Sequence, residues 1–462
     1  MKKVNLWKKG MAYLLVLGMA AGLAGCGQGG ADASAGAGKG AEGSAADKSA
    51  EAEAGSLAQG LEPEEGAEIE LAYWEGSTSD KAAWDELLEN MRRDLPGIKI
   101  TGQTYPSGQF PEMLDTRIGG DDWPDVIRYT YQKIGKFKEA DVMLDLTPYI
   151  TKENLDDLSP AFLSACQYNG KLVAMPHHAD TMAVFYNKEM FEKSGVRIPT
   201  GVDDAWTWDE MTEIARKVKA DNNLPYASGG IWAMNNGYRY LPFIYMAGGS
   251  LLNEDQTEVT INSPEALEGI KLYEDWRKED LFSNGSITGD TTCNQLLAAG
   301  QIAFSFSGSW HCSYMDENMK GKWGVTYMPQ KDGKTGSDMG GNSVFAYKGT
   351  KYPKAAAMVV EYITRAENMK HFCETGSFIP VRTSLLQEGA ISYTNYAGEM
   401  KVFNDIVGTI DPKMAADETS VRFQQLNIIF GEEMDPLIVN GSKTAEEVAA
   451  SCEEKMTEAL QE

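Results

Sequence analysis

The chain has 462 residues, with 68 acidic against 42 basic side chains and a formal net charge of −26. This acidity argues against nucleic acid as a partner and against an anionic substrate held by bulk electrostatics. Solubility at a crowded surface is the ordinary consequence of such a charge, so the acidity alone assigns no function.

The first 25 residues have the pattern of a secretory signal peptide, because four lysines precede an uncharged stretch from Met11 to Ala24. Leu23-Ala24-Gly25-Cys26 then resembles the bacterial lipobox. By that resemblance, cleavage leaves Cys26 as the lipidated (palmitate-bearing) N-terminus. The alternative is an ordinary signal peptide that happens to meet a cysteine. We expect a lipid-anchored protein on the extracellular face of a bacterial membrane.

Residues 26–66 are nearly all Gly, Ala, Ser, Glu and Asp, without an aromatic residue. Such a segment buries too little apolar surface to offset its ordering entropy, so we expect a disordered tether. No later apolar run approaches the roughly 18 residues of a spanning helix. The remaining part is longer than one hydrophobic core usually serves, which predicts two domains.

Five further cysteines are widely spaced and include no Cys-x-x-Cys: Cys166, Cys293, Cys312, Cys373 and Cys452. They form neither a disulfide framework nor a zinc motif, and most should be buried thiols. The sequence leaves undecided whether a disulfide joins one pair, such as Cys293 and Cys312.

The globular part begins with elements typical of an α/β domain. Residues 68–74 alternate polar and apolar as in a half-buried strand, and apolar residues follow at helical spacing between Trp84 and Met91. Pro96-Gly97 stops that helix. Residues 98–100 and 124–127 then read as short strands. Strands that alternate with helices predict a mainly parallel sheet flanked by helices.

The same alternation continues to the C-terminus. Thr207-Trp-Asp-Glu210 is a capping box, and Ser263-Pro264 places an N-cap before a proline at the first helical position. Further helices should begin at Pro353 and after Thr444. No internal repeat is visible.

One stretch is more specific than the rest: Gly170-Lys171, Pro176, Tyr186-Asn187-Lys188 and the capping box at 207–210. Further matches occur along the chain in the family's order: Pro124-Asp125-Val126, Gly300-Gln-Ile-Ala303, Gly308-Ser-Trp310, Gly340-Gly341 and Pro380-x-Arg382. Together these motifs resemble the family 1 extracellular solute-binding proteins, the maltose-binding-protein-like receptors of sugar ABC importers. The resemblance covers about residues 66–460.

The resemblance implies a two-lobed periplasmic-binding-protein-like fold of type II, with a ligand cleft at the hinge. The first lobe would comprise residues 67–177 plus 329–350, and the second residues 178–328 plus 351–462. Crossings are expected near Met175–Asp180, near Tyr327–Gln330 and around Gly349–Pro353. In open parallel sheets, ligands lie beyond the carboxyl ends of the strands, which is consistent with this arrangement.

A neutral sugar offers hydroxyls for hydrogen bonds and C–H faces for flat aromatic rings. By the family's Gly-x-Trp motif, Trp310 is the first aromatic candidate for the cleft. The other aromatic candidates are Trp74, Tyr129, Tyr131, Tyr238 and Trp232, for each of which core packing is the alternative. Trp123 is assigned to the core.

Two carboxylates suit the sugar hydroxyls. Asp180 lies at the first crossing, where the family commonly keeps an acidic residue that contacts ligand, and Glu75 follows the first strand. Gly341 and Asn342 follow the second crossing, where a close backbone favours glycine. Arg382 is either a ligand residue or a structural pairing residue.

His177-His178 gives no metal ligand set, because adjacent side chains on a strand point to opposite sides and the other histidines have no ligand spacing. We expect neither metal nor cofactor. No Gly-x-Ser-x-Gly elbow occurs, and the chain is expected not to be an enzyme.

The resulting hypothesis is a monomeric, lipid-anchored carbohydrate receptor that closes on its ligand and delivers it to the permease of an ABC importer. The alternatives are a receptor for another polar solute, such as an organophosphate or a polyamine, and a surface glycosidase.

Overall fold

The computed structural model describes residues 60–232, 236–288, 291–410 and 412–461. The signal peptide, Cys26 and most of the expected tether lie outside the described residues. The last part of that tether is placed differently from the prediction, because the Glu64 carboxylate accepts hydrogen bonds from Lys354 N and Ala355 N at 2.9 and 3.0 Å. Residues 64–66 therefore belong to the folded part.

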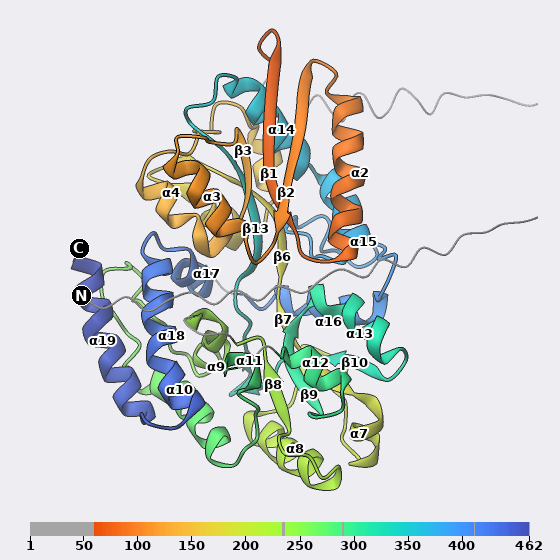
Figure 1. Ribbon diagram of the computed structural model, residues 1–462, viewed down its shortest axis with the longest axis vertical. Coiled ribbons are helices and arrows are strands. Elements are labelled where there is room, and N and C mark those ends of the chain that lie inside the picture. The colour runs from red at the N-terminus through yellow and green to blue at the C-terminus, as the bar shows by residue number, and fades with distance from the viewer. Residues whose placement is uncertain (1–59, 233–235, 289–290, 411, 462) are drawn as a thin grey trace, which may run out of the picture. The chain divides into compact units, whose positions relative to one another are not determined.

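The first lobe is built on a sheet with the strand order β2-β1-β3-β13-β6 (Figure 1). Its strands are β1 (Ala67–Glu75), β2 (Ile98–Pro106), β3 (Val126–Thr130), β6 (Met175–Asp180) and β13 (Gly340–Ala346). The helices around it are α2 (Thr78–Asp94), α3 (Phe110–Gly119), α4 (Gly135–Glu139), α5 (Lys152–Asp156), α6 (Pro160–Ala165), α14 (Pro353–Thr364), α15 (Ala366–Gly376) and the 3-10 helix η1 (Tyr131–Lys133). A short hairpin joins β4 (Gln167–Tyr168) to β5 (Lys171–Leu172).

The second lobe is built on a sheet with the order β10-β7-β9-β8. Its strands are β7 (Met182–Asn187), β8 (Ser228–Gly230), β9 (Phe304–Gly308) and β10 (Trp323–Thr326), with a hairpin of β11 (Gln330–Lys331) and β12 (Lys334–Thr335). Its helices are α7 (Lys188–Lys193), α8 (Trp208–Asp221), α9 (Leu241–Met246), α10 (Pro264–Lys278), α11 (Gly285–Thr288), α12 (Cys293–Ala298), α13 (Cys312–Met319), α16 (Ala397–Val407), α17 (Pro412–Thr419), α18 (Phe423–Val439) and α19 (Ala445–Gln461), with 3-10 helices η2 (Val202–Asp204), η3 (Gly237–Tyr240) and η4 (Ser309–His311).

Both sheets combine parallel strands with a reversed one, as the predicted α/β class requires. β1 pairs in parallel with β2 and β3, whereas β13 runs antiparallel to β3 and β6. In the second sheet β8 and β9 are parallel, and β7 runs antiparallel to β9 and β10. The reversed strands β13 and β7 are the ones that adjoin the crossings, so strand ends of both sheets lie at the hinge.

Local signals in the sequence account for the helices. Ser77 caps α2 by accepting a hydrogen bond from Asp80 N, and the residues that α2 buries recur on one face, including Trp84 and Met91. The expected capping box of α8 is formed by Thr207 and Glu210. The helices predicted after Ser263, at Pro353 and after Thr444 are confirmed as α10, α14 and α19.

The expected lobe boundaries differ from the structure at the second and third crossings. β11 bonds to the second lobe, since Gln330 N donates to Trp206 O at 2.8 Å, so the second crossing follows residue 335. α14 packs on β13 and β6, and α15 packs on α2. Residues 353–376 therefore belong to the first lobe, contrary to the prediction. Ser384 N donates to Asp157 Oδ1 of the first lobe at 2.9 Å, so the chain is still in the first lobe at this residue. The third crossing therefore lies between residue 384 and α16.

No disulfide joins any of the five cysteines of the described residues, and each of these thiols is free and buried. Within the same part of the chain, no helix is both long enough and apolar enough to cross a membrane.

Candidate functional site

The carboxyl end of β1 places Trp74 and Glu75 at the hinge edge of the first sheet. The Trp74 ring lies edge-on to Tyr129 of the neighbouring strand β3, with a centroid distance of 6.3 Å. Tyr129 is buried, and this burial raises the pKa of its hydroxyl. Glu75 stays partly exposed and lies 3.7 Å from Lys81 Nζ. Trp74 and Glu75 thus border the hinge, whereas Tyr129 packs behind Trp74.

A buried arginine, Arg128, packs against the Trp74 ring and fixes its position. The Arg128 guanidinium carbon lies 4.5 Å from the centroid of the Trp74 ring, and Nη1 donates to Trp74 O at 2.7 Å. Asp80, at the start of α2, pairs with the same Nη1 at 3.2 Å. A cation on a ring face is worth roughly 0.5–2 kcal/mol, more when it is desolvated. Arg128 therefore fixes both the ring and the backbone at the end of β1.

The second lobe presents Trp310 at the end of β9. A Cβ built on Gly308 would overlap the six-membered ring of Trp310, so the ring folds back over its own strand. This close approach explains the glycine of the Gly-x-Trp motif. The Arg239 guanidinium carbon of η3 lies 5.1 Å from the Trp310 centroid and 4.4 Å from that of Tyr238. Trp310 and Tyr238 therefore both lie beside the Arg239 guanidinium.

Asp180 lies at the first crossing, at the end of β6. Burial raises its pKa to about 7, while the charges of Arg128 and Arg239 both act to lower it. The side chain is 14% exposed, and its Oδ2 lies 4.0 Å from His178 Nε2. The other oxygen, Oδ1, is buried and has no hydrogen-bond partner among the described residues. A buried acceptor of this kind is costly unless a ligand or water satisfies it.

The second crossing lies directly beside the first, because Met182 N donates to Ser337 Oγ at 2.8 Å. Gly341 has a φ of +108°, and a Cβ there would overlap His178 O, so only glycine suits this approach of β13 to β6. Asn342 Nδ2 lies 2.9 Å from His178 Nε2. Its Oδ1 is a second buried acceptor without a partner in the described part of the chain.

His177 and His178 do not point to opposite sides of the strand as expected. Their ring centroids are 4.8 Å apart, because the β6–β13 register skips His177 and creates a bulge. Burial holds the pKa of both rings well below the usual value. Both histidines are therefore neutral near pH 7. No cluster of His, Cys, Asp or Glu in the described residues is arranged for a metal.

The structure places two predicted site residues in other surroundings. Trp232 is 2% exposed and packs among the rings of Tyr240 and Phe282, at 5.9 and 5.2 Å. Arg382 is buried and donates to Thr364 O at 2.7 Å and to Asn154 O at 3.1 Å. These contacts belong to the lobe interiors. Tyr131 is likewise buried under the first crossing, where its hydroxyl donates to His178 O at 3.3 Å.

Sequence reasoning missed both arginines and their carboxylate partners. Arg239 pairs with Asp338, which is buried between β12 and β13. Burial raises the pKa of Asp338 and of its neighbour Glu418, whereas contact with Arg239 favours the charged form of Asp338. One signal was present: Arg128 directly follows residues 124–127, which were predicted to form a strand. A charge in that position requires a buried partner.

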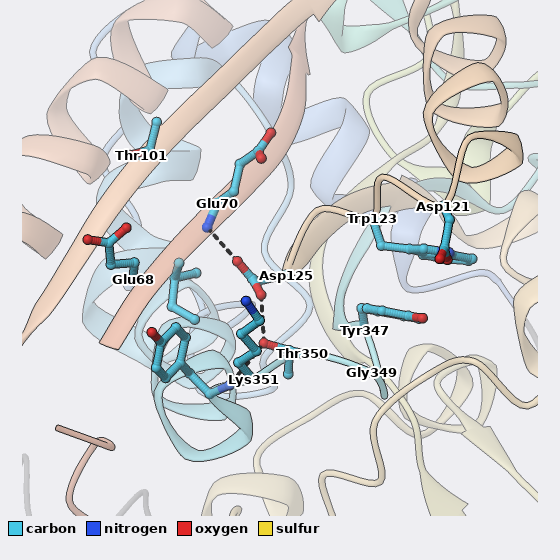
Figure 2. A pocket seen from close by; sticks show the side chains of 12 residues that line it. Glu68, Glu70, Thr101, Asp121, Trp123, Asp125, Tyr347, Gly349, Thr350 and Lys351 are labelled. Carbon is cyan, nitrogen blue, oxygen red and sulfur yellow. Dashed lines mark hydrogen bonds between the residues drawn. The ribbon is translucent and has the colours of Figure 1, made fainter. Parts of the chain in front are cut away.

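A hollow of about 620 Å³ lies at the opposite, amino ends of β1 and β3 (Figure 2). Asp125 on its wall accepts hydrogen bonds from Glu70 N at 2.9 Å and from Thr350 Oγ1 at 2.6 Å. Trp123 stacks on Tyr347 with a centroid distance of 4.4 Å (Figure 2). The Asp125 carboxylate thus has its hydrogen-bond partners within the protein. The length of the strands separates this hollow from the hinge.

Two α/β lobes joined by adjacent crossings, with an unsatisfied carboxylate between aromatic strand ends, define a two-lobed solute-binding protein. A sequence profile of the family described as bacterial extracellular solute-binding protein matches residues 75–370. The chain belongs to this family of extracellular receptors, and it is a binding protein, not an enzyme.

Individual relatives agree with this assignment. A maltotriose-binding protein of Pyrococcus abyssi is 26% identical over 317 residues, which cover 67% of this chain and 65% of the relative. An arabinooligosaccharide-binding protein of Bacillus subtilis is 24% identical over 368 residues, or 75% and 82% of the two chains. An ABC substrate-binding protein from Listeria monocytogenes in complex with cycloalternan superposes with a TM-score of 0.74 at 22% identity, covering 86% of this chain and 99% of that one.

Proposed function

We propose that this protein captures a neutral carbohydrate at the hinge and delivers it to the permease of an ABC importer. The observation that carries the proposal is the unsatisfied Oδ1 of Asp180 at the first crossing. A sugar hydroxyl is a suitable donor for it, and the partly exposed rings of Trp74 and Trp310 suit the C–H faces of a pyranose. The names of the relatives support the same ligand class.

The alternative polar solutes fit these charges less well. Arg128 and Arg239 both have carboxylate partners, Asp80 and Asp338. An organophosphate that approached either arginine would therefore meet an already compensated charge, and it would also face Asp180. A polyamine would find the Asp180 carboxylate, but its positive charges would also meet those of Arg128 and Arg239, which both act at Asp180.

Calorimetric titration against a panel of neutral oligosaccharides, a glycerophosphodiester and a polyamine tests the proposal. We expect a neutral oligosaccharide to bind, with no cleavage products in the same mixtures, and Asp180→Asn to bind it more weakly. Binding of the glycerophosphodiester or the polyamine alone would contradict the carbohydrate assignment, and cleavage of a bound sugar would favour a glycosidase.

We also propose lipid anchoring through Cys26, which rests on the lipobox-like sequence Leu23-Ala24-Gly25-Cys26. Cys26→Ser should release the protein into the medium or leave it unprocessed. Membrane fractionation of cells that express the variant, with Cys166→Ser as the control, decides the point. Unchanged membrane retention of Cys26→Ser would exclude lipid attachment at this residue.

A further inference from the structure

Each lobe carries the same set of three side chains at the hinge. The first-lobe trio is Trp74, Arg128 and Asp80, and the second-lobe trio is Trp310, Arg239 and Asp338. In both trios the guanidinium lies against the tryptophan ring and pairs with a buried aspartate. The charges of both arginines reach Asp180. The trios therefore border one site from its two sides.

The arginine of the first-lobe trio is closed to a ligand. Arg128 is 1% exposed, and Trp74, Trp84 and Phe378 surround its guanidinium at centroid distances of 4.5, 5.4 and 6.0 Å. Its Nη1 is already engaged by Trp74 O and by Asp80. This arginine has a structural role behind the ring.

The second-lobe trio is open. Arg239 is 13% exposed, and among the described residues the hydrogen bond of its guanidinium goes from Nη1 to Asp338 Oδ2. A guanidinium has five N–H donors in a rigid fork. Donors on the Nε and Nη2 side therefore stay uncommitted within the described part of the chain. The guanidinium that carries them lies against the Trp310 ring, and its charge acts on Asp180.

We propose that Arg239 is a ligand-contacting residue of the second lobe, which donates to two adjacent hydroxyls of a sugar that covers Trp310, while Asp338 positions the guanidinium. This inference rests on the proposed carbohydrate function and adds to it the class of sugar. The fork matches two neighbouring oxygens, so the ligand needs a vicinal diol at this point.

The surrounding charges select against an acidic sugar. Asp338 compensates the charge of Arg239, and Asp180 is a second carboxyl group whose charge acts on the same guanidinium. A uronate or phosphate that approached Arg239 would therefore meet two acidic groups and gain little from one compensated cation. The site thus favours an uncharged vicinal diol over its carboxylate analogue.

Titration of the full mature chain with maltotriose, arabinotriose and a glucuronate-terminated trisaccharide tests this inference. We expect Arg239→Lys to weaken binding of the preferred neutral sugar by about tenfold or more, because the ammonium keeps the charge but loses the fork. Arg216→Lys is the matched control, since Arg216 lies on the outer face of α8, paired with Glu279. Its affinity should equal that of the wild type.

Mono-deoxy analogues of the bound sugar provide a second measurement on unmodified protein. Removal of one of two adjacent hydroxyls should weaken binding to the wild type by about tenfold but change little in Arg239→Met, which is the coupling expected of a direct contact. Wild-type affinity of Arg239→Lys with an unchanged melting temperature would overturn the role of Arg239. Tighter binding of the glucuronate would overturn the sugar class. If the wild type binds none of the sugars, the proposed function fails, and the inference fails with it.

Discussion

The two trios contain the same three residue types, yet the surrounding residues give them different roles. Arg128 is enclosed by three rings and by the backbone of Trp74, so its charge stabilises the end of β1. Arg239 lies against Trp310 and Tyr238, and part of its side chain is exposed. The comparison teaches that burial, and not residue type, separates a structural arginine from a binding one.

The largest effect on stability is expected from breaking the buried ion pair between Arg128 and Asp80. Asp80→Ala leaves the buried charge of Arg128 without its carboxylate, and such losses cost about 3–5 kcal/mol of stability. Urea unfolding of the variant measures this cost, with Asp85→Ala as the control because Asp85 is an exposed partner of Lys81. A loss below about 1 kcal/mol would show that the first-lobe trio is not the structural one.

The two Gly-x-Trp sequences of the second lobe sharpen the contrast between core and site. Trp232→Ala should cost about 3–5 kcal/mol of stability, because this ring is enclosed in the aromatic core. Trp310→Ala should instead cost about 2–4 kcal/mol of sugar affinity with little change in melting temperature. Calorimetry and thermal unfolding on both variants separate the two roles. A Trp310→Ala protein that melts early but binds normally would place this ring in the core.

A smaller effect is expected from Gly308→Ala, which substitutes none of the trio residues. The added methyl group overlaps the Trp310 ring and must turn it away from its present position. We expect sugar affinity to fall by about tenfold, or about 1.4 kcal/mol. Gly398→Ala is the control, because a Cβ at Gly398 has open space around it. Unchanged affinity of Gly308→Ala would mean that the orientation of Trp310 does not matter to the ligand.

The smallest expected effect is a pH dependence of sugar affinity that arises from Asp180. A sugar hydroxyl that donates to Asp180 favours the carboxylate, so affinity should rise as pH increases through the pKa of about 7. Between about pH 6 and 8 we expect a change of up to tenfold, which Asp180→Asn abolishes. Titrations in one buffer series measure it. A slope that persists in Asp180→Asn would assign the proton to another group.

Stability of the ligand-free protein should change in the opposite direction. The pKa of Asp180 is raised from 3.8 to about 7, so between these values the folded state holds a proton that the unfolded chain has released. Stability therefore falls as pH rises from about 4 to about 7 and then levels off. Asp417 has a pKa of about 7 as well, so the contribution of Asp180 is the difference between wild type and Asp180→Asn.

The sequence predicted local structure well because the signals are local. The capping box at Thr207 and the proline after Ser263 each determine where a helix begins without reference to the rest of the fold. The lobe that a helix joins is a tertiary property. An apolar face on α14 fits either sheet, and only its packing on β13 and β6 places it in the first lobe.

The same limit applies to the site. The motifs around Asp180 and Trp310 pointed to the hinge, whereas Arg239 has its partner Asp338 at a separation of 99 residues. No local pattern joins two such positions. Trp232 shows the converse limit, because the same Gly-x-Trp spacing leads into the core where the rings of Tyr240 and Phe282 enclose the tryptophan.

The five buried thiols provide a readout of motion in each lobe. Cys166 and Cys373 lie in the first lobe, and Cys293, Cys312 and Cys452 lie in the second, all of them free and buried. Burial raises the pKa of each of these thiols, so they react slowly until the surrounding structure opens. Labelling rates measured by peptide mass spectrometry would then report local unfolding lobe by lobe. A ligand held by both trios should slow modification at all of these positions, whereas a ligand held by one lobe should protect that lobe alone.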